Sequence, residues 1–412
     1  MTTRTVKIGS TQLGVNNKLE PTQLDVVMPD RSKGRYLYGG DNVDINDKGF
    51  IRRRRGQTHI VGASAHSIWA ARRAKTGYAV LDNTLVRLSP QGAGFDQHII
   101  RTVMPPLPVS YSLGPDGDVY WTNKSVLRRI TPAGEDRPVA PSAPTAPVAT
   151  VGAGGSLPKG QYLLALTTVN DDGESPASPV QRLNVPEGGT ISFTLTQAEC
   201  VFLSGPDGDI LTEQGTGDGL VTLSLYYDDG RRCPTLNTAL MPPGAIVRHF
   251  KGSLLVAADN LLFFSLPYNY GIVEMRSSYI PFPAPITIVQ PTDNGVYVCA
   301  DKTYWLSSLQ ADGTLQDVLP YGGIPGTGGE SSITTEVFWQ SPQGLVLADE
   351  NMSVKTPQAN ALEFGEAEFG ATLFRKQDGI TQLVAARSGA GQSTAAAGSF
   401  MEAQIIRKGT VL

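Results

Sequence analysis

The chain has 412 residues, of which 40% are hydrophobic and 17% charged, and its formal net charge is −4. The low charge content, with 45 glycines and 29 prolines spread along the chain, favours an all-β protein with many turns over a helical or disordered one. The acidic balance argues against a surface coated with basic patches for tight nucleic-acid binding.

The chain begins with a polar segment, residues 1–40, that contains Pro21 and Pro29 and is poor in core-forming runs. We expect it to be an arm that reaches onto a neighbouring subunit or an adaptor protein. No apolar leader precedes it, and the sequence has no apolar run of about 18 residues. The sequence therefore predicts a protein made in the cytosol without a membrane-spanning segment.

Two motifs follow the arm. DNVDINDKG, residues 41–49, carries several oxygen ligands and is faintly like a calcium loop, but it lacks the distal Glu, so a strand followed by a glycine turn is favoured. Arg52, Arg53, Arg54 and Arg55 form the one basic cluster. They are candidates for a DNA-channel surface, where arginine contacts with phosphate would be blind to sequence. The favoured alternative is an interface or surface strand, on which only two of the four can share a face.

An internal repeat dominates the rest of the chain. Each copy has a Gly, an alternating strand, a short polar turn and a second alternating strand. The copies are TGYAVLDNTLVRLSP (Thr76–Pro90), DGDVYWTNKSVLRRITP (Asp116–Pro132), KGSLLVAADNLLFFSLP (Lys251–Pro267), NGVYVCADKTYWLSSL (Asn294–Leu309), QGLVLADENMSVKTP (Gln343–Pro357) and, more weakly, DGITQLVAA (Asp378–Ala386). Asp and Asn in the turns tolerate left-handed backbone and suit tight hairpins. The one candidate helix is short, around Leu362 to Phe369.

Hairpins that recur at intervals of about 35 to 50 residues predict the four-stranded blades of a β-propeller. Five clear copies and one weak copy predict five or six blades, with the first strands pairing with the last to close the ring. The alternative is a generic β-sandwich array of hairpins. We expect the propeller to occupy residues 41–137 and 244–412.

The repeat is interrupted at residues 138–243. The interruption opens with Pro138, Pro141, Pro144 and Pro147, which predict a stiff, extended linker. GQYLLALTTVN (Gly160–Asn170) and the acidic turn Asp171-Asp172-Gly173 follow. This stretch resembles a fibronectin type III or immunoglobulin-like domain, with Gly160–Asn170 as its central strand and Tyr162 as a core aromatic. The resemblance implies a β-sandwich inserted in the propeller.

Catalytic and metal-binding patterns are missing from the sequence. The four histidines, His59, His66, His98 and His249, have no metal-ligand spacing, and the three cysteines, Cys200, Cys233 and Cys299, contain no CxxC and read as free thiols. No nucleophile elbow or phosphate-binding loop occurs. The carboxylates sit mainly in turns, among them Asp116, Asp118, Asp207 and Asp209, and turn chemistry explains them. We expect no enzyme activity, no cofactor and no metal; a hydrolase is the minor alternative.

The N-terminal stretches GVNNKLEPTQL and YLYGGDNVDINDKGFIRRRRGQTHI resemble the opening of a group of phage virion proteins. The matching positions are Gly14, Asn16, Asn17, Asn42, Val43, Asp44, Ile45, Gly49, Arg53 and Gly56. Two further stretches, Pro242–Ile272 and the near-terminal AEFGATLFRKQDGITQLVAA with EAQIIRKG, are similar to the same group. The group includes tail tubular or nozzle-type proteins of short-tailed phages, and this chain is shorter than well-known nozzle proteins.

The resemblance implies a structural virion protein of the tail, made in the cytoplasm of the host bacterium. It implies a ring, commonly six-fold, that lies below the portal and adaptor, carries other tail proteins or fibres, and passes DNA through its lumen. The alternative is a propeller at the tail tip that binds a receptor or carbohydrate. Such a protein would need exposed aromatic platforms, and Trp69, Trp121, Trp305 and Trp339 fall about once per blade. Trp121 and Trp305 lie in alternating strands, where an aromatic is usually part of the core.

Overall fold

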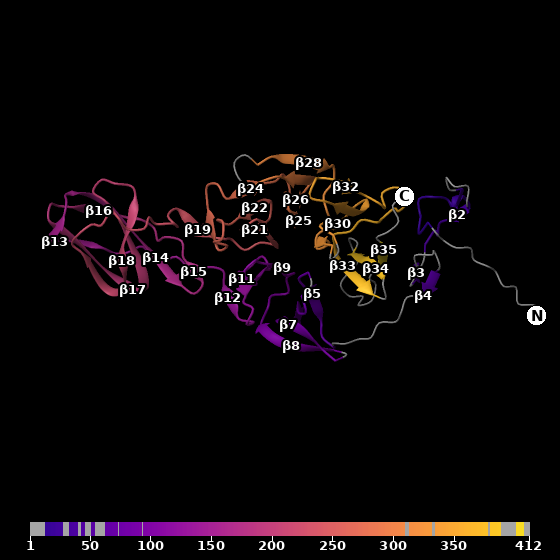
Figure 1. The fold of residues 1–412 in the computed structure, drawn as a ribbon, viewed down its shortest axis with the longest axis horizontal. Helices are drawn as coiled ribbons and strands as arrows, with labels where there is room; N and C mark the ends of the chain where they lie inside the picture. Colours follow the sequence, from indigo (N-terminus) through magenta and orange to yellow (C-terminus); the bar gives the residue numbers. More distant parts are fainter. Residues whose placement is uncertain are drawn as a thin grey trace, which may run out of the picture. The chain divides into compact units, whose positions relative to one another are not determined.

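The structure is a computed structural model. It describes residues 13–27, 33–39, 43–45, 51–53, 62–72, 74–92, 94–309, 313–331, 334–377, 380–388 and 401–407. These residues form β-strands and connecting loops with no α-helix among them; the single helical turn is the 3-10 helix η1 (Pro21–Gln23) (Figure 1). The all-β prediction is confirmed. The helix expected around Leu362–Phe369 is wrong, because residues 362–367 have no regular structure and Phe369 begins a strand.

The chain divides into two compact units. One is Ser64–Phe282, and the other combines Met1–Ala63 with Pro283–Leu412. The predicted domain boundaries, which separate residues 1–40, 41–137, 138–243 and 244–412, stay predictions. Each unit contains small antiparallel sheets, and in most of them the strands pair in chain order.

The unit Ser64–Phe282 contains three four-stranded antiparallel sheets, which we call sheets A, B and C. Sheet A is β5 (Ala65–Trp69), β6 (Gly77–Leu81), β7 (Thr84–Gln91) and β8 (Gly94–Arg101). Sheet B is β9 (Ser110–Leu113), β10 (Val119–Thr122), β11 (Leu127–Ile130) and β12 (Asp136–Pro138). Sheet C is β20 (Ile246–Phe250), β21 (Ser253–Ala258), β22 (Leu261–Phe264) and β24 (Tyr279–Pro281). Beside sheet C, β19 (Thr238–Leu240) pairs with β23 (Ile272–Glu274).

Apolar seams join these three sheets in chain order. Sheets A and B share a core whose largest member is Trp121, and sheets B and C share a core that includes Tyr120. Successive residues of a strand point to opposite faces. Tyr120 and Trp121 of β10 therefore serve the two seams on the two sides of sheet B.

A six-stranded sheet interrupts the unit between sheets B and C, and we call it the inserted domain. Its strands are β13 (Thr150–Leu157), β14 (Gly160–Asn170), β15 (Gly173–Glu174), β16 (Gln181–Val185), β17 (Gly189–Ser204) and β18 (Leu211–Leu223). The 16-residue β17 pairs with β13, β14 and β18, and its ladder shifts register between Leu195 and Glu199. Two apolar clusters pack on its strands, and the larger one contains Tyr162. Gly160–Asn170 is a central strand as predicted, and Tyr162 is fully buried in the larger cluster.

The second unit contains two four-stranded sheets and one three-stranded sheet, which we call sheets D, E and F. Sheet D is β25 (Ile288–Pro291), β26 (Val296–Cys299), β27 (Thr303–Leu306) and β28 (Leu315–Leu319). Sheet E is β29 (Gly329–Glu330), β30 (Val337–Ser341), β31 (Gly344–Ala348) and β32 (Val354–Lys355). Sheet F is β33 (Phe369–Gln377), β34 (Ile380–Ser388) and β35 (Met401–Arg407). Apolar clusters join D to E and E to F.

The N-terminal segment belongs to this second unit. Its strands β1 (Asp25–Val27) and β2 (Lys33–Arg35) pair with each other, as do β3 (Val43–Ile45) and β4 (Ile51–Arg53). Among the described strands, none of these four pairs with sheet F, so the expected pairing of the first strands with the last is not observed. Contact of the arm with a neighbour stays a prediction.

The motif residues near the start hold this segment to its own chain. Gly14 has a φ of 87°, in the left-handed region that favours glycine. The Asn16 side chain accepts hydrogen bonds from the backbone of Lys18 and Leu19. Asn17 donates to and accepts from the backbone of Glu363, at 3.0 and 2.7 Å. Asn17 thus anchors the segment to the backbone at residue 363, whereas the Asn16 side chain stabilises a local turn.

The predicted turns join neighbouring strands at the expected places. Asp82 and Asn83, between β6 and β7, have φ values of 44° and 60°, as a tight hairpin requires. Lys124 and Asp259 are also left-handed in the turns that follow β10 and β21. The polar turns separate strands whose central residues are buried. This alternation of apolar strands and polar turns produces the repeat seen in the sequence.

Candidate functional site

The predicted arginine cluster is only partly placed by the structure. Arg52 and Arg53 lie in β4, opposite Asp44 and Val43 of β3 in the backbone register, while Arg54 and Arg55 lie outside the described residues. The expectation that only two of the four arginines share a face stays a prediction.

The tryptophans that a carbohydrate-binding surface would need are largely internal. Trp121 and Trp339 are fully buried, Trp305 is buried against Tyr297, and half-buried Trp69 stacks on Tyr111 with ring centroids 5.5 Å apart. Three of the four therefore fill apolar seams and present no platform to a ligand.

The described part of the chain offers no metal site, because it has no group of three or more His, Cys, Asp or Glu side chains that could hold an ion. It also has no helix long and apolar enough to cross a membrane. Cys200, Cys233 and Cys299 are free thiols, as predicted. Burial raises the pKa of the Cys299 thiol to about 12.

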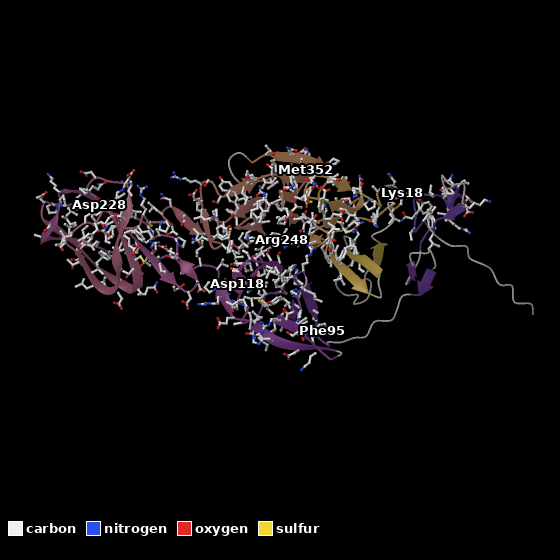
Figure 2. All side chains as sticks on the ribbon, in the orientation of Figure 1. Lys18, Phe95, Asp118, Asp228, Arg248 and Met352 are labelled. Carbon is white, nitrogen blue, oxygen red and sulfur yellow. The ribbon has the colours of Figure 1, made fainter. Side chains whose placement is uncertain are left out.

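The densest charged cluster joins sheet B to the inserted domain, and sequence reasoning did not identify it. We call it the charged joint and define it as Asp118, Arg129, Arg137 and Asp172. Arg129 of β11 donates through Nη1 to Asp118 at 2.6 Å and through Nη2 to Asp172 at 2.9 Å. Arg137 of β12 reaches the same Asp172 through Nε, also at 2.9 Å. Figure 1 draws β15 beside β11 and β12, and Figure 2 labels Asp118 among the side chains of sheet B.

The ion pairs of the charged joint are largely shielded from water, which strengthens their electrostatic interaction. The side chains of Asp118, Arg129 and Asp172 are 7%, 17% and 9% exposed. Burial lowers the pKa of Arg129, but its hydrogen bonds to Asp172 and Asp118 outweigh that effect, and the pKa is raised above its ordinary value. Two arginines face two aspartates, so the joint is electrically balanced.

The joint corrects the interpretation of two predicted turns. Asp118 was expected to serve turn geometry alone, yet its carboxylate is an ion-pair partner. The acidic turn at Asp171-Asp172-Gly173 was expected to close a hairpin, and it does so while also binding both arginines. The available signal was the pair Arg128-Arg129 in a strand followed by Asp136-Arg137, because a basic pair on a half-buried strand needs acidic partners.

A second network supports the joint from within sheet B. Asp136 accepts from Arg128 Nε at 2.7 Å, from Arg101 Nη1 at 3.0 Å and from the Trp121 indole at 3.2 Å. Arg101 belongs to sheet A, so the same carboxylate ties sheets A and B together. The β11–β12 pair is therefore held on both sides by arginine–aspartate contacts.

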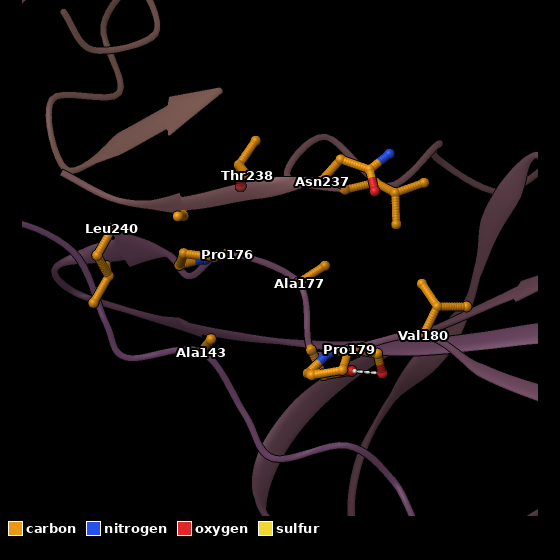
Figure 3. Close-up of a pocket in the computed structure, with 11 residues that line it drawn as sticks. Ala143, Pro176, Ala177, Pro179, Val180, Asn237, Thr238 and Leu240 are labelled. Atoms are coloured by element: carbon orange, nitrogen blue, oxygen red, sulfur yellow. Dashed lines mark hydrogen bonds between the residues drawn. The ribbon is translucent and has the colours of Figure 1, made fainter. Parts of the chain in front are cut away.

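An apolar cleft of about 500 Å³ lies at the same boundary. Figure 3 shows its lining: Ala143 from the proline-rich linker, Pro176, Ala177 and Val180 from the inserted domain, and Leu236 and Leu240 from the returning chain. The side chains offer few hydrogen-bonding groups and no charge. Such a lining suits apolar contacts rather than catalysis.

The sequence matches no protein-family model and no curated protein. Solved structures that resemble the chain include the WD40 β-propeller domain of Doa1, at 9% identity and a TM-score of 0.31, with 79% of this chain and 90% of that chain covered. YjhT matches at 10% identity and a TM-score of 0.34, with 81% of this chain and 93% of that chain covered. AztD of Citrobacter koseri matches at 11% identity and a TM-score of 0.27, with 70% of this chain and 84% of that chain covered. Scores of this size do not establish a shared fold.

Proposed function

We propose that the chain is a structural, non-enzymatic virion protein that forms a ring in a bacteriophage tail. The ring would serve as a conduit for DNA and as an attachment platform for other tail proteins. The observation that carries the proposal is the motif from Gly14 to Gly56, which resembles the opening of tail nozzle and tail tubular proteins. Within this motif, Asn17 bonds to the backbone of Glu363 in both directions, which supports a structural role for the motif.

We further propose that sheets A to F are the six blades of one β-propeller and that the inserted domain is a β-sandwich. Two features support this architecture. The strands of each sheet follow one another along the chain, with a single detour at β23, and successive sheets within each unit share an apolar seam. Small sheets that pack on both faces and follow in chain order are typical of propellers.

A rigid wedge of this kind suits a closed ring, because cyclic assembly needs head-to-tail contacts that repeat at a fixed angle. The proposed neighbours are further copies of the chain, a portal or adaptor protein, and fibres. A lumen with little positive charge lets DNA slide, since binding to phosphate is dominated by lysine and arginine.

The decisive experiment is a mass measurement and negative-stain imaging of the purified full-length chain, alone and after mixing with purified phage tails that lack it. We expect a six-fold ring, or a monomer that joins only to the tails. A monomer that ignores the tails and binds a glycan array would overturn the proposal in favour of the receptor-binding alternative.

The basic cluster allows a second test of the conduit. We propose that Arg52–Arg55 face either passing DNA or a neighbouring subunit. If they face DNA, replacing all four by glutamine weakens salt-dependent binding of duplex DNA to the ring and leaves the ring intact. If they lie in an interface, the same change dissociates the ring at low protein concentration.

A further inference from the structure

We propose that the charged joint is a releasable clamp that fixes the inserted domain against sheet B, and that the domain pivots over the apolar cleft once the clamp is broken. This inference goes beyond the tail function and does not depend on it. It rests on the contacts that cross the boundary, on the two chain crossings and on the position of the cleft.

The first step concerns the kind of contact that crosses the boundary. Arg129 and Arg137 leave sheet B and converge on one carboxylate, that of Asp172, at the tip of the β14–β15 hairpin. Arg129 also donates to the Asp171 carbonyl at 3.4 Å. Ion pairs of this sort depend on geometry, and losing one partner leaves a buried charge without compensation. A small displacement of the hairpin therefore breaks the contacts of both arginines with Asp171 and Asp172, while the Arg129–Asp118 pair stays within sheet B.

The second step concerns the hairpin itself, which presents Asp172 in a fixed position. The backbone N–H of Asp172 donates to the Asn170 side chain at 2.8 Å. On the other side of the turn, Glu174 accepts from Arg231 at 2.6 Å and from Thr167 at 2.8 Å. The hairpin thus moves with the inserted domain as one body, and the flexible element must lie elsewhere.

The third step identifies the two crossings between the domain and its neighbours. The outgoing crossing runs from Pro138, the last residue of β12, to Ala149, which bonds to Gln181 of the domain. The returning crossing is shorter. Thr235 still bonds to Ala177 of the domain and Leu236 packs on the domain's apolar cluster, so Asn237 alone separates them from Thr238 of β19. The Thr238 hydroxyl donates back to the Thr235 carbonyl at 2.7 Å.

Asn237 is the loop residue at this crossing, and hinges are commonly a few loop or element-terminal residues. Its φ of 62° is the left-handed conformation that Asn adopts readily in tight turns, and the Thr238 N–H closes this turn on the Thr235 carbonyl at 3.4 Å. Ala143 lines the cleft from the outgoing crossing, and Leu236 and Asn237 line it from the returning one. Rotation of the inserted domain about the crossings therefore changes the width of the cleft, while the charged joint holds the domain in one orientation against sheet B.

The test measures the spread of distances between the domain and sheet A. The full-length chain, in a Cys233→Ser background, carries spin labels at Gln97→Cys on β8 and Asp218→Cys on β18, both exposed positions. Cys200 and Cys299 are buried and are not expected to react. We expect one narrow distance peak for the parent, and a broad or doubled distribution for Asp172→Asn and for Arg129→Gln.

Lys302→Gln is the matched control, because it removes an ion pair, Lys302 with Asp317 at 2.7 Å, that lies within sheet D and not at this boundary. It should leave the narrow peak unchanged. A narrow peak in folded Asp172→Asn, or equal broadening in Lys302→Gln, would overturn the proposal. If Asp172→Asn does not fold, Arg137→Gln decides in the same way, because the Arg137 side chain is 31% exposed and its loss is better tolerated.

Discussion

Sheet B borders its neighbours in two contrasting ways. Toward sheets A and C it presents mainly aromatic and aliphatic side chains, with one ion pair between Arg101 of sheet A and Asp136, and toward the inserted domain it presents arginines that meet aspartates. Apolar contacts stabilise in proportion to the area they bury and tolerate small shifts, whereas ion pairs need defined distances and can be broken by losing one partner. The contacts between sheets are therefore expected to be harder to break than those between sheet B and the inserted domain.

The largest expected effect is at the seam between sheets A and B. Trp121→Ala removes the largest fully buried side chain there and should lower the free energy of unfolding by about 4 kcal/mol. Urea denaturation followed by circular dichroism measures the change. Ile68→Ala, at a side chain of sheet A that is 72% exposed, should stay within about 0.5 kcal/mol. Equal losses in the two variants would contradict the description of the seam.

The next effect is at the charged joint. Arg129→Met keeps the apolar stem but leaves Asp118 without its arginine, and it should cost about 3 kcal/mol. Combining it with Asp172→Asn should cost less than the sum of the two single changes, because both remove the same ion pair. Additive losses would mean that the two side chains act independently and that the joint is not one unit.

The next, smaller effect comes from removing the hydroxyl group of two buried tyrosines, one that is hydrogen-bonded and one that is not. The Tyr162 hydroxyl donates to the Pro158 carbonyl at 2.9 Å, so Tyr162→Phe should cost about 1 kcal/mol. The Tyr111 hydroxyl, in the seam between sheets A and B, has no hydrogen-bond partner among the described residues. Tyr111→Phe should therefore be neutral or stabilising. Thermal denaturation of both variants measures this, and a larger loss at Tyr111 would contradict it.

The smallest effect concerns Cys299 in the seam between sheets D and E. Its pKa is raised to about 12, so the folded chain holds a neutral thiol while the unfolded chain ionises near pH 9. Its contribution to stability is complete below pH 9 and is lost as the pH rises toward 12. At pH 9 the loss is about 0.4 kcal/mol. Denaturation of the parent chain and of Cys299→Val at pH 7 and 9 isolates the contribution of this thiol to stability. If the variant loses as much stability as the parent between these pH values, the loss does not come from Cys299.

The sequence predicted those parts of the fold that are governed by local rules. Alternating strands around Asp-Asn and Asn-Lys turns are encoded within some 15 residues, so the hairpins and the burial of Trp121 and Trp305 were legible. The long central strand Gly160–Asn170 and buried Tyr162 were legible for the same reason. The absence of a helix near Leu362 was not, because a short helical pattern there yields to the segment's hydrogen bonds with the N-terminal region.

The charged joint could not be predicted from local sequence patterns. Arg129 and Asp172 are 43 residues apart, and only the position of the inserted domain brings them together. Each residue alone has an ordinary explanation, the arginine as a solvated strand position and the aspartate as a turn former. Contacts between elements distant in sequence depend on the angle at which those elements pack, and composition and periodicity carry no information on that angle.

The alternation of Tyr120 and Trp121 bears on how such a chain can change over evolution. Deleting one residue within β10 would exchange the two rings between neighbouring seams and damage both at once. Adding a whole domain after β12 disturbs neither, because the chain has already left the sheet by its last strand. Gains and losses of sequence should therefore be tolerated best at the ends of last strands, and the six-stranded sheet begins at such a place, after β12.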